Sequence, residues 1–413
     1  MRRNLRSRYD PQVWVLLGGS LISSFGTSIA YPFISLYLYL YRGVPMGDVG
    51  LALLAAALAG LLSQYLSGDL CDRLGRKAMM VAGLALNTVA FALLAGAIMI
   101  DLSYAAFVVL LCFRELSGGL YRNIPNVMIV DLVGPGDRTR AFSMLRIGIN
   151  LGFALGPILG GLMAMYSYTA MFAAATIASA VYLCITIFLM RDTKPRHPIP
   201  SRLSNDNSVW GDHQFLLFTV IVLAVSLVYS QMQTTFSTYA GSYGGVNESM
   251  IGLLFAINGM MIVLFQYPVS IFIERFKLTT SLAVGTLLYA VGFGIVGLCS
   301  GFWQLAGCIF LISLGELVYS PPSLNIVVRM ASPESRGRYM GFSCFMGKIG
   351  YALGPAIGGL LMDHMAGEIS VMWFAIGGIG IACVAGFLFL RSIVFREIDK
   401  SAGVARVYPR LHR

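Results

Sequence analysis

The chain has 413 residues, of which 57% are hydrophobic and only 12% are charged, and its formal net charge is +10. Soluble domains carry about 25% charged residues, so a soluble fold of this length would lack the polar residues to cover its surface. The composition excludes an ordinary soluble enzyme and indicates a polytopic membrane protein whose apolar side chains face lipid. The 46 glycines suit close helix contacts in a bilayer.

Long apolar segments recur along the whole chain. A transmembrane helix needs roughly 20 mostly apolar residues. The first candidate is too long for the apolar region of a signal peptide, and no cleavage site follows it. The sequence therefore predicts an all-α membrane protein with twelve transmembrane helices. The predicted spans are 12–41, 49–67, 78–100, 103–131, 140–166, 169–190, 214–243, 249–273, 280–300, 302–329, 338–366 and 370–391.

Lysine and arginine are distributed very unevenly about these spans. If both termini are cytoplasmic, 24 of the 29 basic residues lie on the cytoplasmic side, and only Arg42 lies outside. Cytoplasmic loops of membrane proteins carry such an excess. We predict a multi-pass protein of the cell membrane (plasma or inner) with cytoplasmic termini. Topology and anionic membrane lipid explain the positive charge, and no nucleic-acid partner is needed.

The sequence has no recognisable catalytic or metal-binding pattern. The seven cysteines are scattered without metal-ligand spacing, and the four histidines do not cluster. Nucleotide-binding and nucleophile motifs are absent from the sequence. We therefore expect no enzymatic activity, no cofactor and no metal.

The chain contains an internal repeat. RTRAFSMLRIGINLGFALGPILGG begins at Arg138, and RGRYMGFSCFMGKIGYALGPAIGG begins at Arg336, an offset of 198 residues. Two halves in the same orientation imply a pseudo-twofold axis along the membrane normal, with a substrate site near the midplane between the halves. The predicted domains are a six-helix bundle at 1–190, a cytoplasmic linker at 191–213, a second bundle at 214–391 and a cytoplasmic tail at 392–413.

The segment GDLCDRLGRK, at 68–77, places five charges between two apolar runs. It resembles the loop motif of the major facilitator superfamily, and a degenerate copy follows at 274–276. Arg114 with Gly118 resembles the fourth-helix motif of that family, and GFALGPILGG at 152–161 resembles the fifth-helix motif associated with antiporters. The resemblance covers the whole chain. It implies the major facilitator fold, alternating access and a monomer.

Two interpretations of the 68–77 segment stay open. In one, it is a positively charged anchor with a tight turn at Gly75. In the other, Asp72 and Arg73 pair across the cytoplasmic seam and lock one conformation, with Asp131 as a partner. The residues expected in such a lock are Gly68, Asp72, Arg73, Gly75, Arg76 and Asp131.

The fifth-helix motif also has two interpretations. Small residues and a proline kink allow close helix packing, and the resemblance adds an association with export. A second copy near Gly350 weakens the export interpretation, because it shows that part of the pattern is architectural. The expected packing residues are Gly152, Gly156, Pro157, Gly160, Gly354 and Pro355.

Ionisable residues well inside a span are costly and usually face the protein interior or a cavity. Glu115, Arg122 and Asn126 are spaced i, i+7, i+11, which places them on one helix face. They form either fixed interhelical ion pairs or the polar wall of a cavity. Glu115, Glu316 and Arg114 are the candidates for proton coupling. The candidates for the substrate cavity are Arg122, Asn126, Arg146, Asn150, Lys348 and Tyr319.

Glu316 and Lys348 lie 17 and 15 residues from the centre of the loop between their helices, so we predict a buried pair. Glu316 would carry a proton if substrate or a conformational change broke this pair, and Glu316 is slightly preferred over Glu115 as the carrier. Pro321 and Pro322 are predicted to interrupt the same helix, as a hinge or as a local kink.

These features favour a secondary transporter that works by alternating access, with protons, a small molecule and membrane lipid as partners. The first hypothesis is a proton-coupled multidrug antiporter that exports amphipathic compounds. One alternative is a symporter for uptake of an anionic or polar metabolite, and another is a non-transporting membrane sensor or lipid-handling protein. The first helix is uncharged over 20–40, and basic residues outnumber acidic ones well inside the spans. Both features favour a neutral or anionic substrate.

Overall fold

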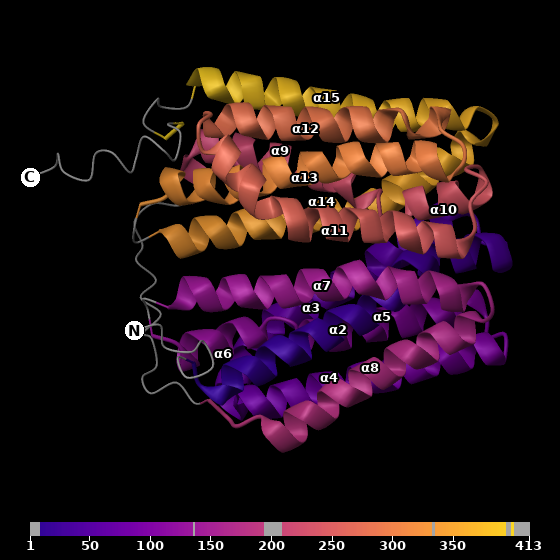
Figure 1. The fold of residues 1–413 in the computed structure, drawn as a ribbon, viewed down its shortest axis with the longest axis vertical. Coiled ribbons are helices and arrows are strands. Elements are labelled where there is room, and N and C mark those ends of the chain that lie inside the picture. The colour runs from indigo at the N-terminus through magenta and orange to yellow at the C-terminus, as the bar shows by residue number, and fades with distance from the viewer. Residues whose placement is uncertain (1–8, 135–136, 194–208, 333–334, 394–397, 400–413) are drawn as a thin grey trace, which may run out of the picture. The chain divides into compact units, whose positions relative to one another are not determined.

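The computed structural model describes residues 9–134, 137–193, 209–332, 335–393 and 398–399. Within these residues all regular structure is helical (Figure 1). Twelve helices are long and apolar enough to cross a membrane, which confirms the predicted fold class for the described residues. Most of the predicted linker, and all of the predicted tail after 393 except 398–399, lie outside the described residues.

The described residues divide into two compact units. Unit 1 comprises the described residues of 1–42, 51–201 and 247–259, and unit 2 comprises those of 43–50, 202–246 and 260–413. Each unit therefore includes the first turns of a helix from the other part of the chain. The predicted bundle boundaries, which divide the chain only at the 191–213 linker, stay a prediction.

The helices of unit 1 come mainly from the first half of the chain. The first predicted span is an α-helix that ends in a π-helical turn, and short connections join most of the following helices (Figure 1). The elements are α2 (Pro11–Leu36), η1 (Tyr37–Tyr41), α3 (Met46–Leu74), α4 (Arg76–Met99), α5 (Tyr104–Tyr121), α6 (Ile124–Leu132), α7 (Arg138–Ala164) and α8 (Tyr168–Leu189).

Unit 2 is built mainly from the second half of the chain, and α12 and α15 run side by side in it (Figure 1). The elements are η2 (Val209–Gly211), α9 (His213–Ser230), α10 (Thr235–Ser242), α11 (Glu248–Ile273), α12 (Leu278–Gly294), η3 (Val296–Leu298), α13 (Phe302–Met330), α14 (Arg336–His364), η4 (Ala366–Glu368) and α15 (Ile369–Ile393).

Both units have apolar cores. In unit 1, Leu16, Met80, Met128 and Tyr182 belong to one buried cluster drawn from α2, α4, α6 and α8. In unit 2, the ring of Phe293 stacks on that of the fully buried Trp373, with 6.4 Å between centroids. Burial of such aromatic side chains contributes strongly to core packing.

The repeated glycine motif packs against the backbone of a neighbouring helix in each unit. A Cβ at Gly152 would lie 2.6 Å from Leu21 O of α2, and a Cβ at Gly354 would lie 2.7 Å from Leu227 O of α9. Carbonyl groups near these contacts accept hydrogen bonds: Ser28 Oγ donates to Gly152 O at 3.1 Å, and Gln231 Nε2 donates to Gly354 O at 2.8 Å. The repeat therefore positions α7 on α2 and α14 on α9 in the same way.

The first turns of α3 and α11 pack against the C-terminal ends of the two glycine motifs. In unit 1, the Cβ position of Gly161 falls against Glu248 O, and that of Gly252 falls against Pro157 O. In unit 2, the Cβ position of Gly359 falls against Met46 O. Only glycine permits such approaches. This packing explains why each compact unit includes a helix start from the other half of the sequence.

Three of the predicted spans differ from the observed helices. The second helix continues to Leu74 instead of ending at 67, so the 68–77 segment is almost wholly helical. The fourth span is broken at Arg122 and Asn123, because Pro125 is tolerated in the first turn of a new helix but not in a helix interior. The seventh span is broken between α9 and α10, at 231–234.

The predicted interruption at Pro321 and Pro322 is wrong, because α13 runs through both residues as one helix. Proline leaves carbonyl groups of the preceding turn without helical donors, but such prolines are tolerated in membrane helices whose surroundings satisfy the backbone.

Candidate functional site

The 68–77 segment forms an ion-pair network inside unit 1. Arg76, at the start of α4, has a side chain only 7% exposed. Its Nη1 contacts Asp72 Oδ1 of α3 at 2.5 Å, and its Nε lies 3.5 Å from Asp131 Oδ2 of α6. Arg76, and not Arg73, is thus the cation that contacts both carboxylates. The network joins three helices of one unit.

Gly75 forms the connection between α3 and α4. Its φ angle is +96°, a conformation that favours glycine, and a Cβ there would lie 2.5 Å from Asp192 Oδ2. Asp192 also accepts a hydrogen bond from the backbone N–H of Lys77 at 3.2 Å, which places a carboxylate at the beginning of α4. Thr193 donates to Asp131 Oδ2 at 3.3 Å. Of the residues after α8, Asp192 therefore binds directly to the 68–77 segment, and Thr193 binds to Asp131, which contacts Arg76 of that segment.

A cavity of about 260 Å³ lies beside this network in unit 1. Its lining includes three of the predicted lock residues, Gly68, Asp72 and Arg76, together with Cys71 and Asn123 at the break between α5 and α6. The broken fourth span therefore forms part of the wall next to the ion pairs.

A second charge cluster of unit 1 lies within the fourth span. Glu115 accepts from Arg114 Nη1 through Oε1, and its Oε2 lies 3.2 Å from Arg122 Nη2. The side chain of Arg114 is 3% exposed, that of Glu115 15% and that of Arg122 51%. The guanidinium of Arg114 also lies 5.1 Å from the centre of the Phe91 ring. These ion pairs lie within α5 and its C-cap and do not join two helices, contrary to the ion-pair interpretation of the sequence.

The other predicted cavity residues of unit 1 lie on α6 and α7. Asn126 is exposed on α6, Arg146 is exposed on α7, and Asn150 is partly buried on α7. Exposed polar side chains this deep in a span are disfavoured against lipid.

In unit 2, Glu316 of α13 lies among tyrosines. The Tyr229 hydroxyl of α9 donates to Glu316 Oε2 at 2.9 Å. The Tyr229 ring lies 5.5 Å from that of Tyr289 and 6.5 Å from that of Tyr351. Tyr319 extends the group, with 6.0 Å between its ring and that of Tyr289. Sequence reasoning missed Tyr229, because it lies 87 residues from Glu316 and on a different helix.

The position of Lys348 on α14 is exposed. Its predicted pairing with Glu316 stays a prediction.

Two further carboxylates, Glu248 and Asp363, were missed by the sequence analysis. Glu248, at the start of α11, accepts from the Tyr41 hydroxyl at 2.6 Å and lies 3.4 Å from that of Tyr168. Asp363, near the end of α14, accepts from Met46 N at 2.9 Å and Gly47 N at 2.7 Å, which caps the start of α3. Asp363 lies within the predicted 338–366 span, and its place after the second glycine motif was the available signal.

Comparison with known proteins identifies the family. The profile of the Major Facilitator Superfamily matches residues 16–246 and 242–406. The chain belongs to this superfamily. It is therefore a multi-pass membrane transporter and not an enzyme, as the sequence analysis predicted.

Relatives within the superfamily match most of the chain. Multidrug resistance protein MdtH of Photorhabdus laumondii is 26% identical over 377 residues, which cover 89% of this chain and 91% of MdtH. The MFS-type transporter YqjV of Bacillus subtilis is 24% identical over 364 residues, which cover 86% of this chain and 87% of YqjV.

Solved transporters of low sequence identity share the fold. A peptide transporter POT in complex with sulfate has a TM-score of 0.76 at 18% identity, with 97% of each chain covered. The nucleoside transporter NupG has a TM-score of 0.75 at 13% identity, with 93% of this chain and 100% of NupG covered. These similarities show the major facilitator fold alone.

Among the described residues of this superfamily member, no three His, Cys, Asp or Glu side chains form a metal-binding group. The chemistry available near the middle of the spans is therefore that of carboxylates, guanidiniums, an ammonium and tyrosine hydroxyls. Such groups bind polar parts of a substrate and take up or release protons.

Proposed function

We propose that this transporter is a proton-coupled exporter of neutral or anionic amphipathic molecules. Its similarity to the MdtH proteins, named for multidrug resistance, supports export. The excess of cationic side chains well inside the spans supports the charge class of the substrate, because Arg122, Arg146 and Lys348 all occupy exposed positions.

The observation that carries proton coupling is the different setting of the two carboxylates. Glu115 contacts two guanidiniums, which favour its ionised form in every state that keeps those contacts. Glu316 accepts a hydrogen bond from the Tyr229 hydroxyl. A phenol donates to a carboxylate and accepts from a carboxylic acid. Tyr229 can therefore stay bonded to Glu316 before and after a proton binds, and we assign the proton to Glu316.

Lys348 has a defined role in this scheme. If it approaches Glu316 in one conformation, as the sequence predicts, its positive charge expels the proton there. When substrate binding or a conformational change separates Lys348 from Glu316, Glu316 takes up a proton from the opposite side of the membrane. Charge on Glu316 is then coupled to conformation, which is the requirement for exchange of a proton against a substrate.

The test compares Glu316→Gln, Glu115→Gln and Glu368→Gln in proteoliposomes with an imposed pH gradient and a neutral or anionic fluorescent amphiphile. At one-to-one exchange, a gradient of one pH unit supports about tenfold accumulation. Glu316→Gln should still exchange substrate but lower the accumulation ratio to about one. Glu368, exposed on η4, is the matched control and should behave as the unmodified protein.

The outcomes separate the candidate functions. Full pH-driven accumulation by the Glu115→Gln/Glu316→Gln double variant would exclude both carboxylates as the proton carrier. Substrate movement in the same direction as the protons would favour the second candidate, an uptake symporter for an anionic or polar metabolite. The exposed cationic side chains within the spans also suit that alternative.

A further inference from the structure

Two cysteines meet at the connection between α12 and α13. Cys299 follows η3, Cys308 lies in the second turn of α13, and their sulfur atoms are 3.4 Å apart. Cys308 is 1% exposed and Cys299 is partly exposed. All seven cysteines lie in the described part of the chain, where this is the one sulfur–sulfur contact.

The loop that carries Cys299 is fixed to three neighbouring segments. The Tyr239 hydroxyl of α10 donates to Cys299 O at 3.1 Å, and Gly301 N donates to Gly244 O at 2.7 Å. Ser370 Oγ of α15 donates to Gly297 O at 2.6 Å. These hydrogen bonds fix the loop that places Cys299 Sγ 3.4 Å from Cys308 Sγ. A disulfide requires the two sulfurs to approach to about 2.0 Å.

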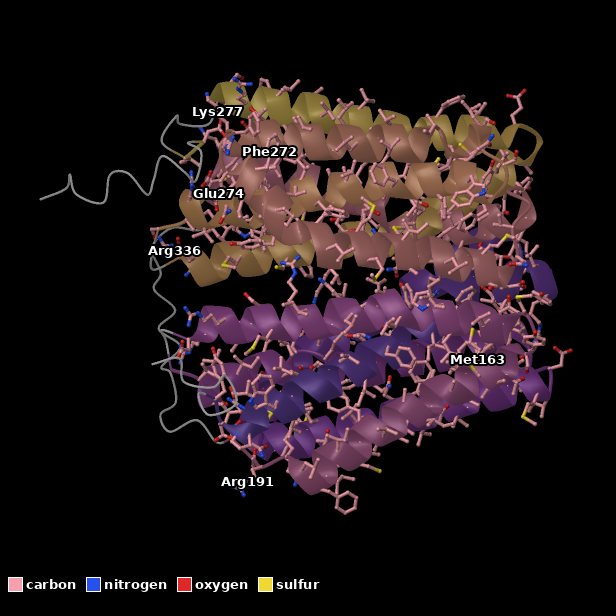
Figure 2. The ribbon with its side chains drawn as sticks, viewed as in Figure 1. Met163, Arg191, Phe272, Glu274, Lys277 and Arg336 are labelled. Carbon is pink, nitrogen blue, oxygen red and sulfur yellow. The ribbon has the colours of Figure 1, made fainter. Side chains whose placement is uncertain are left out.

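This thiol pair lies at the end of unit 2 that is far from its basic residues. Glu274, Lys277 and Arg336 lie together at one end of the unit (Figure 2). From Lys277, α12 runs 17 residues to Gly294, a rise of roughly 25 Å, and the Cys299 loop follows. Because basic residues mark the cytoplasmic side, the thiols belong on the outer side, where disulfides persist.

We propose that Cys299 and Cys308 are a modification site at which a disulfide oxidant, a protein or a small molecule on the outer side, forms an intramolecular disulfide. The Cys299 thiolate attacks the disulfide of the oxidant, forms a mixed disulfide and releases one thiolate. The Cys308 thiolate then attacks Cys299 Sγ and displaces the second thiolate. The two protons lost by the cysteines end on the two thiols of the reduced oxidant, so one disulfide is reduced as the other forms.

The order of the two attacks follows from exposure. An oxidant in solution reaches the partly exposed Cys299, whereas Cys308 is buried and reaches only its neighbour. Cys308 is therefore the resolving thiol.

The bond would restrain the helix that carries Glu316. Glu316 lies eight positions after Cys308 along α13, a rise of about 12 Å. The disulfide closes the ring from 299 to 308, which ties the beginning of α13 to the end of α12. The modification is independent of the proposed transport direction, because it depends on the thiol pair and on the membrane topology alone.

The first experiment traps thiols in cells that express the full chain, by denaturation in N-ethylmaleimide, and maps cysteine peptides by mass spectrometry without reduction. We expect a linked pair of peptides containing Cys299 and Cys308, lighter by two hydrogen atoms than the reduced pair. Cys71 and Cys184 serve as internal controls and should carry the alkyl group. Alkylation of both Cys299 and Cys308 in the cell-derived protein would overturn the proposal.

The second experiment treats reduced, purified protein with oxidised glutathione. The unmodified chain should lose two thiols without retaining glutathione, and Cys308→Ser should retain one glutathione on Cys299. Stable glutathione on Cys299 of the unmodified chain would show that the second step fails, which also overturns the proposal. The oxidised chain should melt at a higher temperature than the same protein after reduction, and the Cys299→Ser/Cys308→Ser variant should show no such shift.

Discussion

Arg76 connects two carboxylates that come from different helices. Its nearly buried guanidinium contacts Asp72 of α3 at 2.5 Å and Asp131 of α6 at 3.5 Å. The side chain of Asp72 is 71% exposed, and an exposed pair by itself is worth roughly 0–1 kcal/mol. The strength of this network must therefore come from the burial of Arg76 and from the two carboxylates acting together.

The shared cation predicts non-additive effects of neutralising the two acids. Asp72→Asn and Asp131→Asn should each leave the protein folded and inserted but slow transport, and the double variant should be little worse than either single variant. The coupling free energy should be about 0.5–3 kcal/mol, measured by transport rate and thermal denaturation of all four proteins. Asp69→Asn, an exposed position on α3, is the control. Strictly additive losses would show that the two acids do not act through Arg76.

The two ion pairs of Glu115 differ in exposure and should therefore differ in their contribution to stability. Its carboxylate contacts Arg114, which is 3% exposed, and Arg122, which is 51% exposed. Removing the carboxylate leaves the Arg114 guanidinium buried without that acceptor. We expect Glu115→Gln to lower the free energy of unfolding by about 1–3 kcal/mol, and Arg122→Gln by roughly 0–1 kcal/mol. Thermal denaturation in one detergent checks the difference, and an equal loss in both variants would contradict it.

At the scale of the element, the glycine motifs bring helices into backbone contact. A Cβ at Gly354 would lie 2.7 Å from Leu227 O, whereas a Cβ at Gly341 of the same helix would meet nothing within 4 Å. Alanine is also the better helix former, by roughly 0.5–1 kcal/mol relative to glycine. Alanine at Gly354 changes both helix packing and helix propensity, whereas alanine at Gly341 changes helix propensity alone.

We predict opposite effects for alanine at these two positions. Gly354→Ala should destabilise the protein by about 1–3 kcal/mol, because α14 or α9 must shift. Gly341→Ala should leave stability unchanged or raise it. Melting temperatures in a common detergent test both variants. A stable Gly354→Ala protein would mean that the α9–α14 contact yields at little cost.

At the scale of the whole molecule, the distribution of basic residues predicts the orientation. With both termini cytoplasmic, 24 of 29 lysines and arginines lie on the inner side. Ser204→Cys falls in the predicted cytoplasmic linker, outside the described residues. Tyr166→Cys replaces an 86% exposed residue between α7 and α8, on the predicted outer side.

Labelling of intact cells with an impermeant thiol reagent tests this orientation. In a chain whose native cysteines are replaced, Tyr166→Cys should react and Ser204→Cys should react only after the membrane is opened. Figure 2 places Met163 and Arg191 at opposite ends of unit 1, so labels at the two ends report opposite faces. Ready labelling of Ser204→Cys from outside would reverse the topology and, with it, the assignment of the Cys299 loop to the outer side.

The twelve spans, the repeat and the family could be predicted from the sequence, because they depend on local apolar length and on motifs read along the chain. The sequence also placed Gly75 in a turn and Glu115 next to basic residues. Proline positions were less informative: the sequence placed a break at Pro321 and Pro322, whereas the helix breaks before Pro125. A proline shows which backbone donor is absent, but the surrounding packing decides whether the helix tolerates the loss.

Contacts between groups far apart in the sequence could not be predicted and are seen only in the folded chain. Arg76 rather than Arg73 contacts Asp72 and Asp131, Tyr229 donates to Glu316, and Cys299 touches Cys308. Arg73 and Arg76 are equivalent in a sequence, but Arg73 lies in the last turn of α3 and Arg76 begins α4. The turn at Gly75 separates them, and only Arg76 contacts both acids. A contact between two helices depends on how each helix is rotated about its axis and how far along the axis each residue lies. Apolar periodicity predicts the rotation only when one face is apolar, and here nearly every face is apolar.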